Sequence, residues 1–138
     1  MRPKQTTPRR RERAGGVARR KTPIEVDLSV IEELADGDSA ELAGLIAMFN
    51  RHMADGIEQV RAAIETCELA SVARVAHTCI GFTLTLGIIA LEPTLRKLER
   101  ASKQGQPKEI ARWLAQWERE FEQVRQALVA RMNRSGAV

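Results

Sequence analysis

The chain has 138 residues, of which 43% are hydrophobic and 29% charged, and this length suits one soluble domain with a buried core. Its two cysteines are too few for a disulfide scaffold and favour a reducing, cytoplasmic compartment, while the 4% aromatic content without Tyr favours helices over sheet. The longest apolar run, about a dozen residues, is shorter than the ~20 of a membrane span, and the N-terminus lacks the apolar segment of a secretory signal.

The net charge of +4 is unevenly distributed, because residues 1–22 form a strongly basic arm. Residues 1–21 hold nine Lys/Arg and one acid, Glu12, for a local charge of +8. With two prolines, two glycines and few apolar side chains, this arm is expected to be disordered. It could contact nucleic acid or an anionic surface, although it has no aromatic side chain to stack on bases. The alternative is a solvated tail without a specific ligand.

Amphipathic helical patterns begin after the arm and continue to residue 134, so we expect one helical domain over residues 23–134. Asp27 or Ser29 can cap a short first helix. Asp38 then has the position of an N-cap for a long helix. The apolar side chains of this long helix recur on one face, at Leu42, Leu45, Ile46, Phe49, Met53, Ile57, Val60 and Ile64.

Three further helices follow with short connections. A faint break at residues 66–68 precedes a helix that carries His77 and ends or bends at Gly87. The next helix must hold Pro93 in or near its first turn, and Pro107 opens the last one. The last helix has a narrow apolar seam at Ile110, Leu114, Trp117, Phe121, Val124 and Leu128. The sequence therefore predicts an all-α fold, an up-and-down antiparallel four-helix bundle with a short N-terminal lid helix.

His77 stands out in the most apolar helix of the chain. At 100° per residue it lies about 100° or more from the middle of the buried face, at the edge of that face or outside it. Half of the residues one or two turns away are Ala or Gly, so we expect the imidazole to be open to a large partner. These neighbours are Ala70, Ala73, Arg74, Ile80, Gly81 and Leu84.

A motif begins at this histidine. It reads His77-Thr78-Cys79-Ile80-Gly81-Phe82-Thr83, followed by Leu86-Gly87 and a leucine-spaced helix that ends in Leu98-Glu99. This pattern resembles the histidine-containing phosphotransfer (HPt) domain, whose motif is approximately H-T-L-K-G-S-S, a short spacer, L/I-G-A and a helix ending in L-E. The resemblance spans about Val26 to Leu128. Two positions depart from it: Ile80 stands where the family usually has Lys, and Phe82 where it usually has Ser.

The resemblance implies a phosphorelay intermediate. His77 would accept a phosphoryl group from a receiver-domain aspartate and pass it to another response regulator, and a hybrid or sensor histidine kinase would be a further partner. No cofactor is implied on this chain, since Mg²⁺ is expected on the partner receiver domain. Gly81 would leave room for the phospho-aspartate, and Arg74 is the candidate to balance the phosphoryl charge in place of the absent Lys. The docking surface would comprise Ala70, Ala73, Thr78, Ile80 and Leu84.

The departures at Ile80 and Phe82 leave a second interpretation open. It is a degenerate HPt-like module that docks a receiver or kinase without carrying phosphate. The chain has no glycine-rich phosphate loop, so we expect a phosphocarrier without an ATP site or autokinase activity. We expect no metal site, because zinc needs about four converging ligands and His77 and Cys79 point to different faces of their helix. The other histidine, His52, is expected to face solvent.

Overall fold

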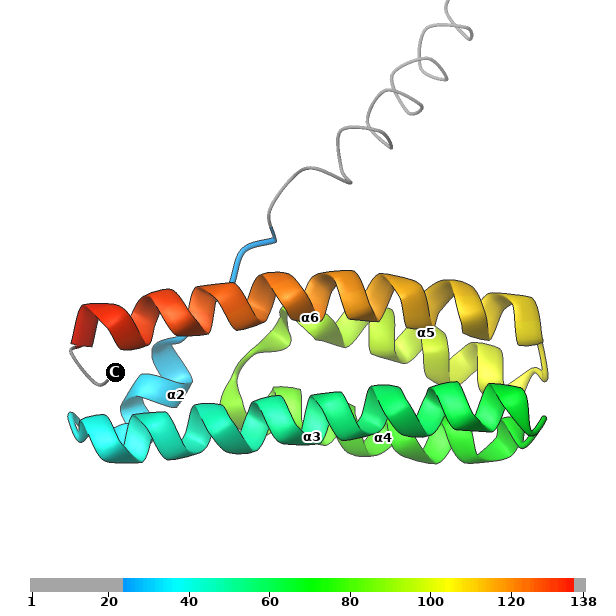
Figure 1. The fold of residues 1–138 in the computed structure, drawn as a ribbon, viewed down its shortest axis with the longest axis horizontal. Coiled ribbons are helices and arrows are strands. Elements are labelled where there is room, and N and C mark those ends of the chain that lie inside the picture. Colours follow the sequence, from blue (N-terminus) through cyan, green and yellow to red (C-terminus); the bar gives the residue numbers. More distant parts are fainter. Residues whose placement is uncertain (1–23, 136–138) are drawn as a thin grey trace, which may run out of the picture.

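The computed structural model describes residues 24–135, so the predicted basic arm lies outside the described residues. Within them are five α-helices and one 3₁₀ turn: α2 (Ser29–Ala35), α3 (Ser39–Glu65), α4 (Leu69–Leu86), η1 (Ile89–Leu91), α5 (Glu92–Lys103) and α6 (Pro107–Ser135). The four long helices run alternately in opposite directions, and α2 lies at the end of the bundle where α3 begins and α6 ends (Figure 1). The predicted all-α, up-and-down four-helix bundle is confirmed.

The helix boundaries follow from local chemistry. Asp38 is the N-cap of α3, where its Oδ1 accepts hydrogen bonds from the backbone N–H groups of Ala40 (2.9 Å) and Glu41 (3.1 Å). Pro93 lies in the first turn of α5, where a missing N–H costs nothing. The faint break after α3 is a tight turn in which Cys67 adopts a positive φ of 59°. The predicted helix boundaries at these positions are therefore confirmed.

Gly87 fixes the lid helix against the end of α4. It terminates α4 in the left-handed conformation, with φ 73°. A Cβ built at this position would lie 2.5 Å from Cβ of Val30 in α2. Glycine is therefore required here both for its backbone conformation and for the close approach of α2.

The bundle core contains the whole seam predicted for α6. Trp117 and Phe49 are its largest fully buried side chains, and the Phe49 and Phe121 rings meet edge to face with centroids 6.3 Å apart. Gly56 of α3 lets the helices approach closely, since a Cβ there would lie 2.7 Å from the Cys79 sulfur. The buried positions of the seam are Ile110, Leu114, Trp117, Phe121, Val124 and Leu128.

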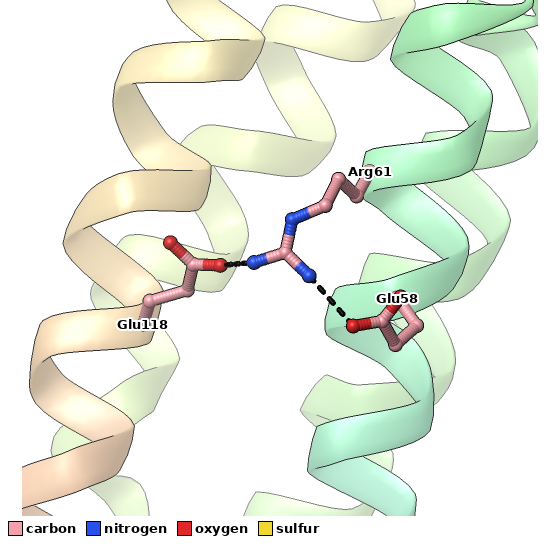
Figure 2. A network of polar contacts seen from close by, with 3 residues as sticks. All are labelled: Glu58, Arg61 and Glu118. Atoms are coloured by element: carbon pink, nitrogen blue, oxygen red, sulfur yellow. Dashed lines mark hydrogen bonds and ion pairs between the residues drawn. The ribbon is translucent and has the colours of Figure 1, made fainter.

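Ion pairs join the helices on the outside of the bundle. Arg61 of α3 pairs with Glu58 of its own helix at 2.7 Å and reaches across to Glu118 of α6 (Figure 2). Arg131 of α6 pairs with Glu32 of α2 at 2.6 Å. Exposed pairs of this kind contribute about 0–1 kcal/mol each, so the apolar core supplies most of the stability.

By length and composition alone, α4 could cross a membrane, although the sequence indicates only a shorter apolar run. A core helix of a bundle meets the same criterion. One face of α4 packs against the other helices, and the buried residues on it are Val72, Ala76, Cys79, Ile80, Thr83 and Leu86. The apolar character of α4 is therefore explained by the core that it helps to form.

Candidate functional site

The imidazole of His77 lies on the outer surface of α4 and is 77% exposed. Its Nδ1 is 3.4 Å from Oε2 of Glu99, a residue of α5 that is only 16% exposed. An ionised carboxylate can only accept a hydrogen bond, so this contact favours the tautomer that carries its proton on Nδ1. The other ring nitrogen, Nε2, then keeps its lone pair for a reaction. The sequence offered one signal for Glu99, the L-E ending of the motif, but not its contact with His77.

Glu99 also contacts a second basic group. The ammonium of Lys103 is 3.5 Å from the same Oε2 atom, one helical turn further along α5. The site thus contains an imidazole, a carboxylate and an ammonium in a row, drawn from two neighbouring helices. Sequence reasoning did not identify Lys103, because its proximity to His77 depends on how α4 and α5 pack.

Gly81 lies one turn after His77 and faces open space. A Cβ built at this position meets no heavy atom within 4 Å outside its own helical backbone, in contrast to Gly56 and Gly87. Glycine inside a helix costs about 1 kcal/mol relative to Ala, and neither packing nor a positive φ requires it here. The space beside the imidazole is therefore available to an approaching molecule.

Phe82 does not obstruct His77, although it occupies the position where the family usually has Ser. It is five residues further along the helix, about 140° around the axis. Its ring stacks on the imidazole of His52 in α3, with centroids 4.0 Å apart and an interplanar angle of 21°. The prediction that His52 faces solvent is therefore wrong: His52 is half-buried because Phe82 covers one face of its ring.

Among the predicted docking residues, the prediction for Ile80 is wrong. It is only 3% exposed and belongs to the core, because it lies three residues after His77, on the edge of α4 that faces inward. Leu84, by contrast, is 48% exposed and lies close to the direction of His77 around the helix. The other predicted docking positions are exposed at Ala70 and Thr78 and half-buried at Ala73.

An apolar groove of about 310 Å³ runs beside Gly81, between α3 and α4. Its walls include Met48 of α3 and the ring of Phe82. Of its lining residues, Thr78 follows His77 directly and Gly81 lies one helical turn after it. The residues that line it are Met48, Thr78, Gly81, Phe82, Thr85 and Leu86.

Arg74 lies on a different side of α4 from the Glu99 contact. It is exposed and lines a pocket of about 470 Å³ between α3 and α4, together with His52 and Asp55. Within residues 24–135, Arg74 takes part in no ion pair with an acidic side chain. The structure therefore brings Lys103, and not Arg74, to the carboxylate beside His77. The role of Arg74 in balancing the phosphoryl charge stays a prediction.

The neighbouring thiol takes no part in this site. Cys79 is 3% exposed, and burial raises the pKa of its thiol to about 12, so the thiol stays neutral at physiological pH. Across the described part of the chain, no three His, Cys, Asp or Glu side chains are grouped so that they could hold a metal ion. The chemistry available here is that of an exposed imidazole beside a carboxylate.

Comparison with known proteins places this geometry in a family. A family model described as "Hpt domain" matches residues 44–127, more than half of the chain. The crystal structure of histidine-containing phosphotransfer protein B from Pseudomonas aeruginosa PAO1 shares the fold, with a TM-score of 0.71 at 22% identity over 79% of this chain and 95% of that chain. No curated protein sequence matches. Hpt domains are phosphocarriers of phosphorelays that need no cofactor and interact with receiver domains and kinases, and this chain belongs to the Hpt domain family.

Proposed function

We propose that this chain is a phosphorelay intermediate in which His77 accepts a phosphoryl group from a receiver-domain aspartate and passes it to another response regulator. The observation that carries the proposal is the 77% exposed imidazole, whose Nδ1 faces Glu99 while Gly81 leaves the approach open. Because its partners in such a relay are cytoplasmic signalling proteins, the proposal also places the chain in the cytoplasm.

The proposed transfer changes two bonds. The Nε2 lone pair of His77 attacks phosphorus, and an N–P bond forms as the P–O bond to the aspartate breaks. The bonding electron pair leaves on the aspartate oxygen, which becomes a carboxylate. The Nδ1 proton stays on the ring, where the Glu99 carboxylate stabilises the resulting positive charge. Onward transfer reverses these bonds with a second receiver domain.

This chain needs to provide few catalytic groups besides His77, because phosphoryl transfer depends mainly on positioning and charge stabilisation. The receiver domain would supply Mg²⁺, and the bundle would hold the imidazole at a fixed place. Leu84 and the apolar groove beside Gly81 would give the receiver an apolar footing near the reacting atoms. The buried Ile80 has no part in this contact.

The second candidate function is a docking module that binds a receiver or kinase without carrying phosphate. The observation that favours it is Ile80, a buried apolar residue at the position where the family usually has Lys. Under this alternative the exposed face of α4 still binds the partner, but His77 gains no phosphate.

Both candidates are tested by incubating the chain with receiver domains that carry ³²P on their aspartate. Under the proposal, wild type gains an acid-labile, alkali-stable phosphate and His77→Gln gains none. His52→Gln, which removes the other histidine, is the matched control and is expected to keep the phosphate. Wild type that binds the receiver but gains no phosphate would instead support the docking module.

A further inference from the structure

The exposed face of α4 lacks a lysine near His77, so the charge that builds up on a phosphorylated His77 needs another partner. We infer that Lys103, on the neighbouring helix α5, is the cation that stabilises the phosphoryl group on His77. The inference rests on the proposed function and names the residue that supplies its positive charge. Lys103 takes part in no bond change.

Glu99 holds this lysine close to the imidazole. A single oxygen, Oε2, lies 3.4 Å from Nδ1 of His77 and 3.5 Å from Nζ of Lys103. The Glu99 side chain is 16% exposed, so the carboxylate is held between the two helices. The ammonium is therefore held on the same carboxylate as the imidazole before any phosphate arrives.

Phosphorylation would change which acid this ammonium prefers. Before transfer, one carboxylate and one ammonium face each other beside the imidazole ring. A phosphoryl group adds roughly two negative charges near neutral pH and presents three acceptor oxygens. Lys103 has a flexible four-carbon stem and a side chain that is 66% exposed, so we expect it to turn from Glu99 toward the phosphoryl oxygens on the Nε2 side of the ring.

Other basic residues are less well placed for this task. Arg74 lines the pocket on the α3 side of α4, together with His52 and Asp55. Arg96 is engaged with Glu92 of its own helix at 2.7 Å. Among the basic side chains in residues 24–135, only Lys103 shares a carboxylate with His77.

The test compares Lys103→Ala, Lys103→Arg and the matched control Lys108→Ala, which removes an equal charge from an exposed lysine on α6. The measured quantity is the equilibrium ratio of phospho-His77 to phosphorylated receiver domain. We expect Lys103→Ala to shift it about 1.4- to fivefold toward the receiver, the range for an exposed ion pair, and Lys103→Arg to restore it. Lys108→Ala should match wild type. The difference should shrink in roughly 1 M NaCl, where charges are screened within ~3 Å.

A second readout reports the contact directly. When phosphoramidate, a small donor, phosphorylates the full chain, the ¹⁵Nζ signal of Lys103 should shift and that of Lys108 should not. Equal equilibrium ratios for Lys103→Ala and Lys108→Ala, or an unmoved Lys103 signal, would overturn the inference while the His77→Gln result still upholds the function. A wild-type chain that takes phosphate from neither donor overturns both.

Discussion

Two glycines, one within α4 and one at its end, differ in backbone conformation and in the space available for a side chain. Gly87, at the end of α4, has a positive φ and no room for a methyl group, because Val30 of the lid helix lies against it. Gly81, six residues earlier, has an ordinary helical backbone and open space where its side chain would be. The fold explains Gly87 completely and does not explain Gly81. The difference separates a glycine that the bundle needs from one whose open space, under the proposed function, an approaching receiver domain would use.

The largest effect on stability is expected at the lid junction. Gly87→Ala forces a left-handed residue with a Cβ into a space already filled by Val30. Backbone strain of about 1–3 kcal/mol and a comparable overpacking cost together predict a loss of about 2–6 kcal/mol of unfolding free energy. Chemical denaturation measures it. A loss below about 0.5 kcal/mol would mean that α2 does not pack on Gly87 as described.

A somewhat smaller loss is expected where the family usually has Lys. Ile80→Lys introduces an ammonium at a position that is only 3% exposed, so the change should cost about 1–3 kcal/mol of unfolding free energy. We therefore expect the added positive charge not to raise the rate of phosphoryl transfer to His77, because the ammonium lies away from the surface. Urea denaturation and receiver-to-His77 transfer are measured on the same sample. Wild-type stability together with faster transfer would show that position 80 can reach the surface.

A substitution at Gly81 should change stability and transfer rate in opposite directions. Gly81→Ala should raise the unfolding free energy by about 0.5–1 kcal/mol, because Ala is the better helix former and its methyl group meets nothing. The same methyl group should slow transfer from a receiver domain but leave phosphorylation by phosphoramidate unaffected, since only the large donor needs the space. Stopped-flow kinetics measure the rate of phosphoryl transfer, and thermal melts measure the stability. Unchanged receiver transfer would remove the steric role of Gly81.

The smallest effect is expected on the outer surface of α3 and α6. Arg61→Ala breaks the pairs with Glu58 and Glu118, and exposed pairs are worth about 0–1 kcal/mol (Figure 2). Thermal melts should show a small shift, with phosphate transfer equal to wild type. A large loss of transfer in this variant would place part of the partner interface on α3 and α6.

The bundle was largely predictable because its signals are local. The cap at Asp38, the terminator at Gly87 and the start at Pro107 act within one turn, and the seam from Ile110 to Leu128 repeats along a single helix. A pattern of this kind needs no knowledge of the neighbouring helices. The basic arm is a separate matter, because it lies outside the described residues.

The contacts of the site that could not be predicted from the sequence depend on how the helices pack against one another. Glu99 contacts His77, and Lys103 contacts Glu99, only because α5 packs beside α4. The stack of Phe82 on His52 depends on the rotation of α3. Ile80 shows the limit of a motif position as a guide to exposure. At 100° per residue it lies about 60° from His77 toward the buried Ala76 and Thr83, so helical periodicity alone places it near the buried face. Periodicity was the better guide to exposure.

The central claim is that Nε2 of His77 carries the phosphoryl group. It is tested most directly by phosphorylating a ¹⁵N-histidine-labelled chain with a receiver domain and recording ¹⁵N spectra with ³¹P coupling. We expect a single phosphorus-coupled nitrogen, Nε2 of His77, while Nδ1 keeps its proton toward Glu99. Phosphorus coupling at His52, or no coupled histidine nitrogen at all after incubation, would contradict it.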